Sequence, residues 1–209
     1  MKFATHRNII LILVILHIVG LVGISIPQTR DLVLSLSPIN LFIGFLLLLV
    51  SEFNNKRSLL TFILFAFVIG FGSELIGVHT GILFGNYSYG ANLGLKFMEV
   101  PLIIGINWAV LAITSASLTE KLTEYLSVKV LVNTVLMVFF DFIMEPVAMK
   151  SDFWSWHNDE IPFYNYVCWF FIALLLQVIY LIFFKIKSNI VFKSLFIIQL
   201  VFFIILNLF

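Results

Sequence analysis

Three acidic side chains lie inside long apolar stretches of this sequence. Asp141 and Glu145 are four residues apart, so a helix places both carboxyl groups on one face. Glu74 lies near the end of a different apolar stretch. An acid within a membrane is costly, and it usually faces the bundle interior, where it handles substrate, ions or protons. We therefore expect one site of acid–base chemistry here. The alternative is that headgroups and water solvate these acids at the membrane interface.

Polar and aromatic residues near these acids extend the candidate site. Asn107 lies in the outer half of another apolar stretch, and His79 follows Glu74 by five residues. An aromatic belt at the membrane interface explains Trp and Tyr in any membrane protein, but the run WSW at 154–156 is denser than a belt requires. The aromatic candidates in the connecting segments are Phe84, Tyr87, Tyr89, Trp154 and Trp156.

A metal site is a weaker interpretation of the same residues. Such a site needs three or four His, Asp, Glu or Cys ligands. His79 and His157 could converge with the acids, but the sequence has no HxxxH or HExxH spacing. The single cysteine, Cys168, lies in an apolar run without an evident base, and we interpret it as a small buried side chain. We expect neither a metal nor another cofactor.

The composition is that of a membrane protein. Of the 209 residues, 62% are hydrophobic and 11% are charged, whereas soluble domains contain about 25% charged residues. The net charge of +1 provides no concentrated basic face, so we expect no nucleic-acid partner. No linker or repeat divides the chain, and we expect residues 1–209 to form a single transmembrane helical domain.

Seven stretches are long and apolar enough, or nearly so, to cross the bilayer as helices. A crossing takes about 20 mostly apolar residues. The first stretch follows Lys2 and Arg7 but is too long for a signal peptide and lacks a cleavage site. The sequence therefore predicts an all-α, polytopic transmembrane helix bundle. The stretches are 9–26, 33–50, 59–76, 101–117, 129–146, 166–184 and 190–208.

The basic residues predict the orientation of these spans. Lys and Arg in short loops favour the cytoplasmic side. With the N-terminus in the cytoplasm, nine of them lie inside and three lie outside, which supports an odd number of spans. The inner set is Lys2, Arg7, Lys56, Arg57, Lys121, Lys129, Lys185, Lys187 and Lys193, and the outer set is Arg30, Lys96 and Lys150.

This orientation brings the polar residues to one depth. The two long connections, 77–100 and 147–165, both face outward, and long loops often carry function. At 1.5 Å per residue, Glu74, Asn107 and Asp141 come within roughly 3–10 Å of the outer boundary. We therefore predict one polar pocket that opens toward the outer leaflet.

The same residues, in this order, carry a family resemblance over about 70–170. The runs are ELIGVHTG at 74–81, FGNYSYG at 84–90, VP at 100–101, NW at 107–108, Asp141 with EP at 145–146, WSW at 154–156 and PFYNYVCW at 162–169. Together they resemble the signature of the integral-membrane carotenoid biosynthesis proteins, which include carotenoid 1',2'-hydratases and bisanhydrobacterioruberin hydratases. Glu145 stands where the family more often has Asp, a conservative departure.

The resemblance implies a hydro-lyase of the cell membrane whose partners are membrane lipid and a lipid-soluble carotenoid. Water would add to the terminal isoprenoid C=C of an acyclic (ψ) end, giving a tertiary alcohol. Protonation of the alkene needs an acid that stays neutral in an apolar site, and aromatic faces stabilise the cation that forms. We assign Asp141 as the acid, Glu145 and Glu74 as its partners, and His79 as the base. The expected substrate-binding residues are Trp154, Trp156, Tyr87, Phe84 and Asn107.

Three other functions remain open at this point. An ion or proton transporter also uses intramembrane acids, but it needs polar residues through the full depth, and the inner halves of the spans are almost wholly apolar apart from Asn133. A metal-dependent enzyme acting on another polyisoprenoid would need metal ligands. A non-catalytic scaffold would have almost the same sequence.

Overall fold

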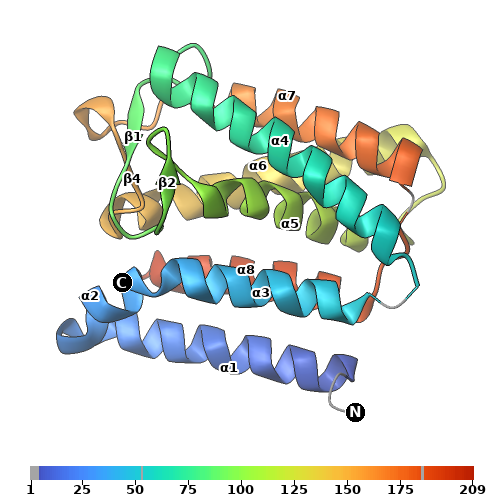
Figure 1. Ribbon diagram of the computed structural model, residues 1–209, viewed down its shortest axis with the longest axis horizontal. Coiled ribbons are helices and arrows are strands. Elements are labelled where there is room, and N and C mark those ends of the chain that lie inside the picture. Colours follow the sequence, from blue (N-terminus) through green and yellow to red (C-terminus); the bar gives the residue numbers. More distant parts are fainter. Residues whose placement is uncertain (1–4, 53, 185) are drawn as a thin grey trace.

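The computed structural model describes residues 5–52, 54–184 and 186–209 and is mainly helical (Figure 1). Lys2 and Lys185, which we assigned to the cytoplasmic side, lie outside the described residues. The helices are α1 (His6–Ser25), α2 (Pro27–Ser35), α3 (Ser37–Ser51), α4 (Lys56–Thr80), α5 (Leu102–Thr119), α6 (Leu126–Lys150), α7 (Phe163–Ile179) and α8 (Ile190–Leu206). A 3-10 turn (His157–Asp159) precedes α7 and a π-helical turn (Tyr180–Phe184) follows it.

Every predicted apolar stretch is helical in the structure. Among the described residues, five helices (α1, α4, α5, α6 and α7, the last with its π turn) are long and apolar enough to cross a membrane. The second stretch is broken into α2 and α3, which bend by 55°. Pro38 causes the break, because it has no backbone N–H for a helical bond to Leu34. The seventh stretch, α8, is shorter at 17 residues.

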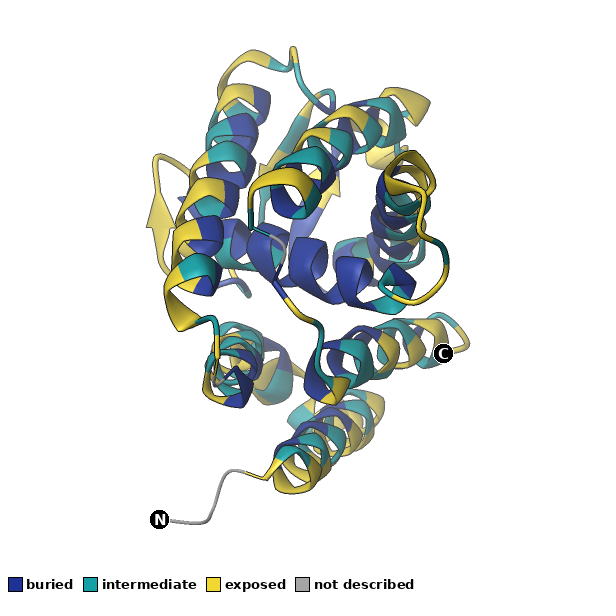
Figure 2. Cartoon of the chain, turned by 90° about the vertical axis from the view of Figure 1, so that its right-hand side faces the viewer, coloured by how far each residue is buried: buried dark blue, intermediate teal, exposed yellow. Residues whose placement is uncertain are grey.

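Successive helices run back and forth, and α1 begins at the opposite end of the bundle from the end where α8 finishes (Figure 1). Figure 2 shows buried residues on the inward sides of the helices and exposed residues on the outward sides. Large apolar side chains such as Leu64 and Phe171, each 63% exposed, occupy that outer surface. Water would not solvate such a surface well, whereas lipid tails do. The chain is a multi-pass membrane protein.

α5 is the central helix of the bundle and packs against α3, α4, α6 and α8. Small residues along it, such as Ala109, Ala112 and Ala116, are almost completely buried and let the neighbouring backbones approach closely. Gly105 is needed on the same helix, because a Cβ there would lie 2.6 Å from the Phe67 ring of α4. This close packing fixes the positions of α4 and α6, which hold the three acids.

The two long connections meet at one end of the bundle and contain short strands that sequence patterning did not predict. They are β1 (Tyr87–Tyr89), β2 (Lys96–Phe97), β3 (Val100–Pro101) and β4 (Trp154–Trp156). β1 pairs with β4 in an antiparallel arrangement, and β2 pairs with β3. Gly81 ends α4 in a left-handed conformation (φ 65°) that starts the first connection. The β1–β4 pair joins the connection after α4 to the one after α6.

Candidate active site

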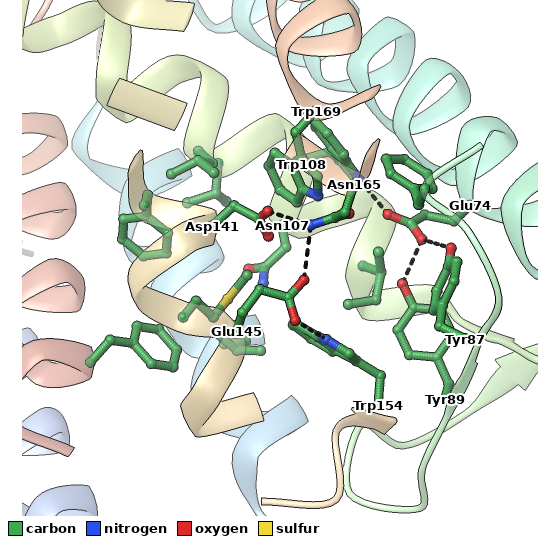
Figure 3. Close-up of a pocket in the computed structure, with 18 of the residues that line it drawn as sticks. Glu74, Tyr87, Tyr89, Asn107, Trp108, Asp141, Glu145, Trp154, Asn165 and Trp169 are labelled. Atoms are coloured by element: carbon green, nitrogen blue, oxygen red, sulfur yellow. Dashed lines mark hydrogen bonds between the residues drawn. The ribbon is translucent and has the colours of Figure 1, made fainter. Parts of the chain in front are cut away.

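A polar pocket lies among α4, α5, α6 and α7, next to the β1–β4 pair (Figure 3), and side chains of α3 and α8 also line it. Its cavity volume is about 60 Å³, several times the space that one water molecule needs. Glu74 of α4 and both acids of α6 line this cavity, together with Asn107 of α5. The three acids are 1–4% exposed. These four residues therefore converge in one pocket, as predicted.

Glu74 is held by three hydrogen-bond donors. The hydroxyl groups of Tyr87 and Tyr89 both donate to Glu74 Oε2, the second at 2.7 Å. The indole Nε1 of Trp108 donates to Oε1 at 3.1 Å. Both carboxyl oxygens of Glu74 therefore act as acceptors, which is the arrangement that suits a carboxylate.

Glu145 is held in the same way by a different set of donors. Trp154 and Trp156 each donate from Nε1 to Glu145 Oε2 at 2.8 Å. The side-chain amide of Asn165 donates to Oε1 at 3.1 Å. Because all three partners are donors, Glu145 also serves only as an acceptor.

Asp141 differs from the other two acids. Its Oδ2 accepts a bond of 3.0 Å from Asn165 Nδ2, the same amide nitrogen that binds Glu145. Its Oδ1 is buried and has no hydrogen-bond partner among the described residues. A buried carboxylate with an unpaired oxygen is costly. A protonated Oδ1 would instead be a donor available to whatever occupies the pocket.

The strand register brings the aromatic donors to the acids. Successive side chains of a strand point to opposite faces. In the runs YSY and WSW the four aromatic residues therefore share one face, while Ser88 and Ser155 point outward and are exposed. Burial raises the pKa of the Tyr87 and Tyr89 hydroxyls far above the usual range, and the nearby Glu74 charge raises it further. Both tyrosines thus stay protonated and remain donors.

Aromatic rings also wall the cavity on its α5 and α7 side. Trp108 and Trp169 stack with ring centroids 3.9 Å apart and planes at 22°. Gly70 of α4 makes room for Trp108, whose Cβ would lie 2.5 Å from a Cβ added at position 70. Phe84 lines the cavity from a left-handed backbone conformation (φ 66°), and its N–H bonds to Cys168 Sγ at 3.2 Å. Cys168 is buried, as expected.

The two candidate histidines, His79 in the last turn of α4 and His157 in the 3-10 turn, lie outside the pocket. His79 is exposed, its Nε2 lies 3.1 Å from the Met98 carbonyl oxygen, and it does not line the pocket. His157 is exposed beyond β4. The position of His79 gives no support to its predicted role as the base. Within the described ranges, no group of three or more His, Cys, Asp or Glu side chains could hold a metal ion.

Asn133 belongs to a separate buried cluster and not to the pocket. It accepts a bond of 2.7 Å from Thr119 and donates to Gln177 at 3.1 Å. Gln177 in turn donates to the Ala112 carbonyl at 3.0 Å and to Ser115 at 3.1 Å. These bonds join α5, α6 and α7, so the cluster holds the helices together.

Some site residues escaped sequence reasoning. Asn165 and Gln199 of α8 line the pocket, although the sequence alone predicts a site role for neither. Trp108 and Trp169 were likewise not assigned to the site. The i, i+4 spacing of Asn165 and Trp169 on one helix face was a signal that could have found two of them. No such signal pointed to Gln199.

Comparisons with known proteins agree with the resemblance. The family described as carotenoid biosynthesis protein matches residues 33–209. A bisanhydrobacterioruberin hydratase from Haloarcula japonica is 30% identical over 115 residues, which cover 47% of this chain and 36% of the relative. The match thus spans about a third of that protein's length. No solved structure matches the chain significantly.

Proposed function

Because the chain belongs to the family of carotenoid biosynthesis proteins, we propose that it is a hydratase that acts on an acyclic carotenoid within the membrane. Water adds across the terminal isoprenoid double bond, and the product is a tertiary alcohol. The bisanhydrobacterioruberin hydratase that resembles this chain supports the reaction class. The observation that carries the proposal is Asp141, a buried acid with an unpaired oxygen beside two acids that donors hold on both oxygens.

In this proposal Asp141 starts the reaction as the general acid. Its Oδ1–H transfers a proton to the less substituted carbon of the double bond, and the π electrons form the new C–H bond. A tertiary carbocation remains at the other carbon. Proton transfer by a positioned side chain accelerates such steps by about 10²–10⁴-fold.

The pocket walls stabilise the cation and restrain its reactivity. Trp108, Trp154 and Trp156 line the cavity and present aromatic rings, whose electron-rich faces attract a cation. The negative charges of Glu74 and Glu145 lower the energy of the cation further. Their oxygens are already engaged by donors, which keeps them from attacking the cation in place of water.

A water molecule completes the addition. Asn107 lines the cavity, and its side-chain amide makes no hydrogen bond with the described residues. In the view of Figure 3 it lies between Asp141 and Glu145. We assign it to hold the water whose oxygen bonds to the cationic carbon. The proton released by that water returns to Asp141, so the protein ends the cycle unchanged.

The membrane arrangement forms part of the proposal. α1, the bent α2–α3 pair, α4, α5, α6, α7 and α8 make seven passes through the cell membrane, and the N-terminus lies in the cytoplasm. The start of α1 and the end of α8 lie at opposite ends of the bundle, which supports an odd number of passes (Figure 1). In this orientation the pocket lies near the outer face, where a lipid-soluble carotenoid and water can meet.

The test is expression in a host that makes lycopene, followed by mass analysis of the pigments. We expect pigments heavier by one or two waters, and none from Asp141→Asn produced at an equal level. Val135→Phe, a change on the outer surface of the same helix, is the control and should retain activity. Unchanged pigments from the wild-type protein would refute hydration of this end group, and full activity of Asp141→Asn would refute the assigned acid.

A further inference from the structure

A second cavity adjoins the polar pocket on the side of α1, α3 and α8. It has a volume of about 60 Å³ and shares lining residues with the pocket on four helices. These shared residues include Leu41 of α3, Ile104 and Asn107 of α5, Met144 of α6 and Gln199 of α8. Because the same side chains border both spaces, the two cavities are neighbours, and we refer to them together as the chamber.

The second cavity is chemically different from the first. None of the three acids borders it. Away from the shared residues it is lined largely by apolar side chains from α1, α6 and α8, such as Ile24, Val147 and Phe202. Four of these ten unshared residues are polar but uncharged side chains: Ser37, Asn40, Ser151 and His17, which is bonded to the Leu13 carbonyl oxygen at 2.8 Å. This part of the chamber therefore suits a hydrocarbon better than a charged or strongly polar group.

The opposite side of the polar pocket leads to a polar surface. Tyr87 and Trp156 border both the pocket and an open cavity of about 400 Å³ beyond the β1–β4 pair. That outer cavity is lined by Asn86, Ser88, Ser155 and similar polar residues. A long hydrocarbon would be poorly solvated there, while water would be well accommodated.

We propose that the second cavity binds the polyene chain next to the reacting end group. This inference rests on the proposed function, because it takes a long acyclic carotenoid as the substrate. The stiff conjugated chain cannot fold back inside a polar pocket of about 60 Å³. It extends through the apolar cavity while its end group lies beside Asp141.

Gln199 and Asn107 mark the boundary between the two parts of the chamber. Both line both cavities, and neither side-chain amide has a hydrogen-bond partner within the described part of the chain. A pair of amides at this place would bind the hydroxyl group of the product and leave the hydrocarbon on the apolar side. The chamber thus sets how far the substrate enters before its end reaches the acid.

Two substitutions narrow the second cavity without touching the polar pocket. Ile24→Phe acts from α1 and Val147→Phe acts from α6, and neither residue lines the polar pocket. Matched controls place the same new side chain on the outer surface of the same helices, at Ile15 and Val135, each 51% exposed. Two cavity variants on different helices make a common folding failure a poor explanation of a shared effect.

The experiment compares a long probe with a short one in the purified full-length protein in detergent micelles. Lycopene binding is followed by quenching of tryptophan fluorescence, which reports on the site because all four tryptophans of the chain line the polar pocket. Myrcene, a short acyclic isoprenoid with the same type of terminal double bond, is the probe for turnover in the polar pocket alone.

We expect both cavity variants to weaken lycopene binding by about tenfold or more, and the controls to change it by less than about twofold. Myrcene turnover should be the same in all five proteins. Lycopene binding that is unchanged in both cavity variants would overturn the inference. Suppose that lycopene binds to the wild type and that its binding is weakened only in the cavity variants, but neither probe is converted. The proposed hydratase function would then be refuted, while polyene binding in the second cavity would be supported. If the wild type converted lycopene and both cavity variants bound it normally, the hydratase function would be supported and polyene binding in the second cavity would be refuted.

Discussion

Tyr87 of β1 lies opposite Trp156 of β4 in the antiparallel pair, and each donates a hydrogen bond to a different acid. Tyr87 binds Glu74 of α4, and Trp156 binds Glu145 of α6. One register therefore fixes two carboxyl groups that come from separate helices. The small β1–β4 sheet thereby fixes the position of Glu74 relative to Glu145.

Trp156→Phe tests this arrangement, because it removes one donor and keeps an aromatic ring. Glu145 then keeps only Trp154 and Asn165 as partners. A hydrogen bond to a charged group contributes about 1.5–3 kcal/mol, so we expect hydration to fall by about 10–100-fold. The measurement is the yield of hydrated pigment per amount of membrane protein. Ser155→Ala, on the outward face of the same strand, is the control, and an equal loss there would point to damage of the whole sheet.

Asn165→Ala removes the donor that is shared by the two acids of α6. Asn165 Nδ2 donates to both Asp141 Oδ2 and Glu145 Oε1, and Ala provides no donor to either. Each lost bond leaves a buried acceptor unpaired at a cost of about 1–3 kcal/mol. We expect at least a tenfold loss of hydration, roughly equivalent to 1.4 kcal/mol. Thermal unfolding in detergent is measured alongside, and full hydration by a stably folded Asn165→Ala variant would show that neither acid needs this donor.

Gly70→Ala and Gly72→Ala form a matched pair on α4. A Cβ at position 70 would lie 2.5 Å and 2.7 Å from Trp108 Cβ and Cδ1, whereas nothing lies within 4 Å of one at position 72. We expect Gly70→Ala to lower the free energy of unfolding by about 1–3 kcal/mol through overpacking. Hydration should fall with it, because Trp108 moves away from Glu74. Gly72→Ala should be neutral or slightly stabilising, by up to about 1 kcal/mol. Thermal unfolding in detergent measures both, and equal stabilities of the two variants would contradict the packing around Trp108.

Labelling with a membrane-impermeant thiol reagent tests the orientation of the spans. Cys168 is buried, so the wild-type chain is the blank. Leu122→Cys lies in the connection between α5 and α6, and Glu160→Cys lies between β4 and α7, and both positions are exposed. With the N-terminus in the cytoplasm, intact cells should be labelled at position 160 only. Position 122 should react with the reagent only after the cells are permeabilised. The reverse pattern would invert the topology and place the pocket near the inner face.

The sequence by itself determined the bundle and the main members of the site. Apolar stretches of sufficient length leave helix formation as the way to satisfy backbone groups in lipid, so all seven predicted stretches are helical. Asp141 and Glu145 had to share a face because their spacing matches one helical turn. Glu74 and Asn107 were predicted to lie at the same depth in the membrane as Asp141. This depth follows from the limits of each span and the helical rise per residue.

Only the tertiary structure decided how the acids differ. Whether a carboxyl oxygen meets a donor depends on contacts between residues far apart in sequence, such as Trp108 with Glu74 and Asn165 with Asp141. The β1–β4 pairing joins residues 67 positions apart, for which no local pattern exists. It gives the aromatic residues, which we expected only to face the cation, a second role as donors. His79 is close to Glu74 in sequence but points to Met98, because the last turn of α4 directs it away from the pocket.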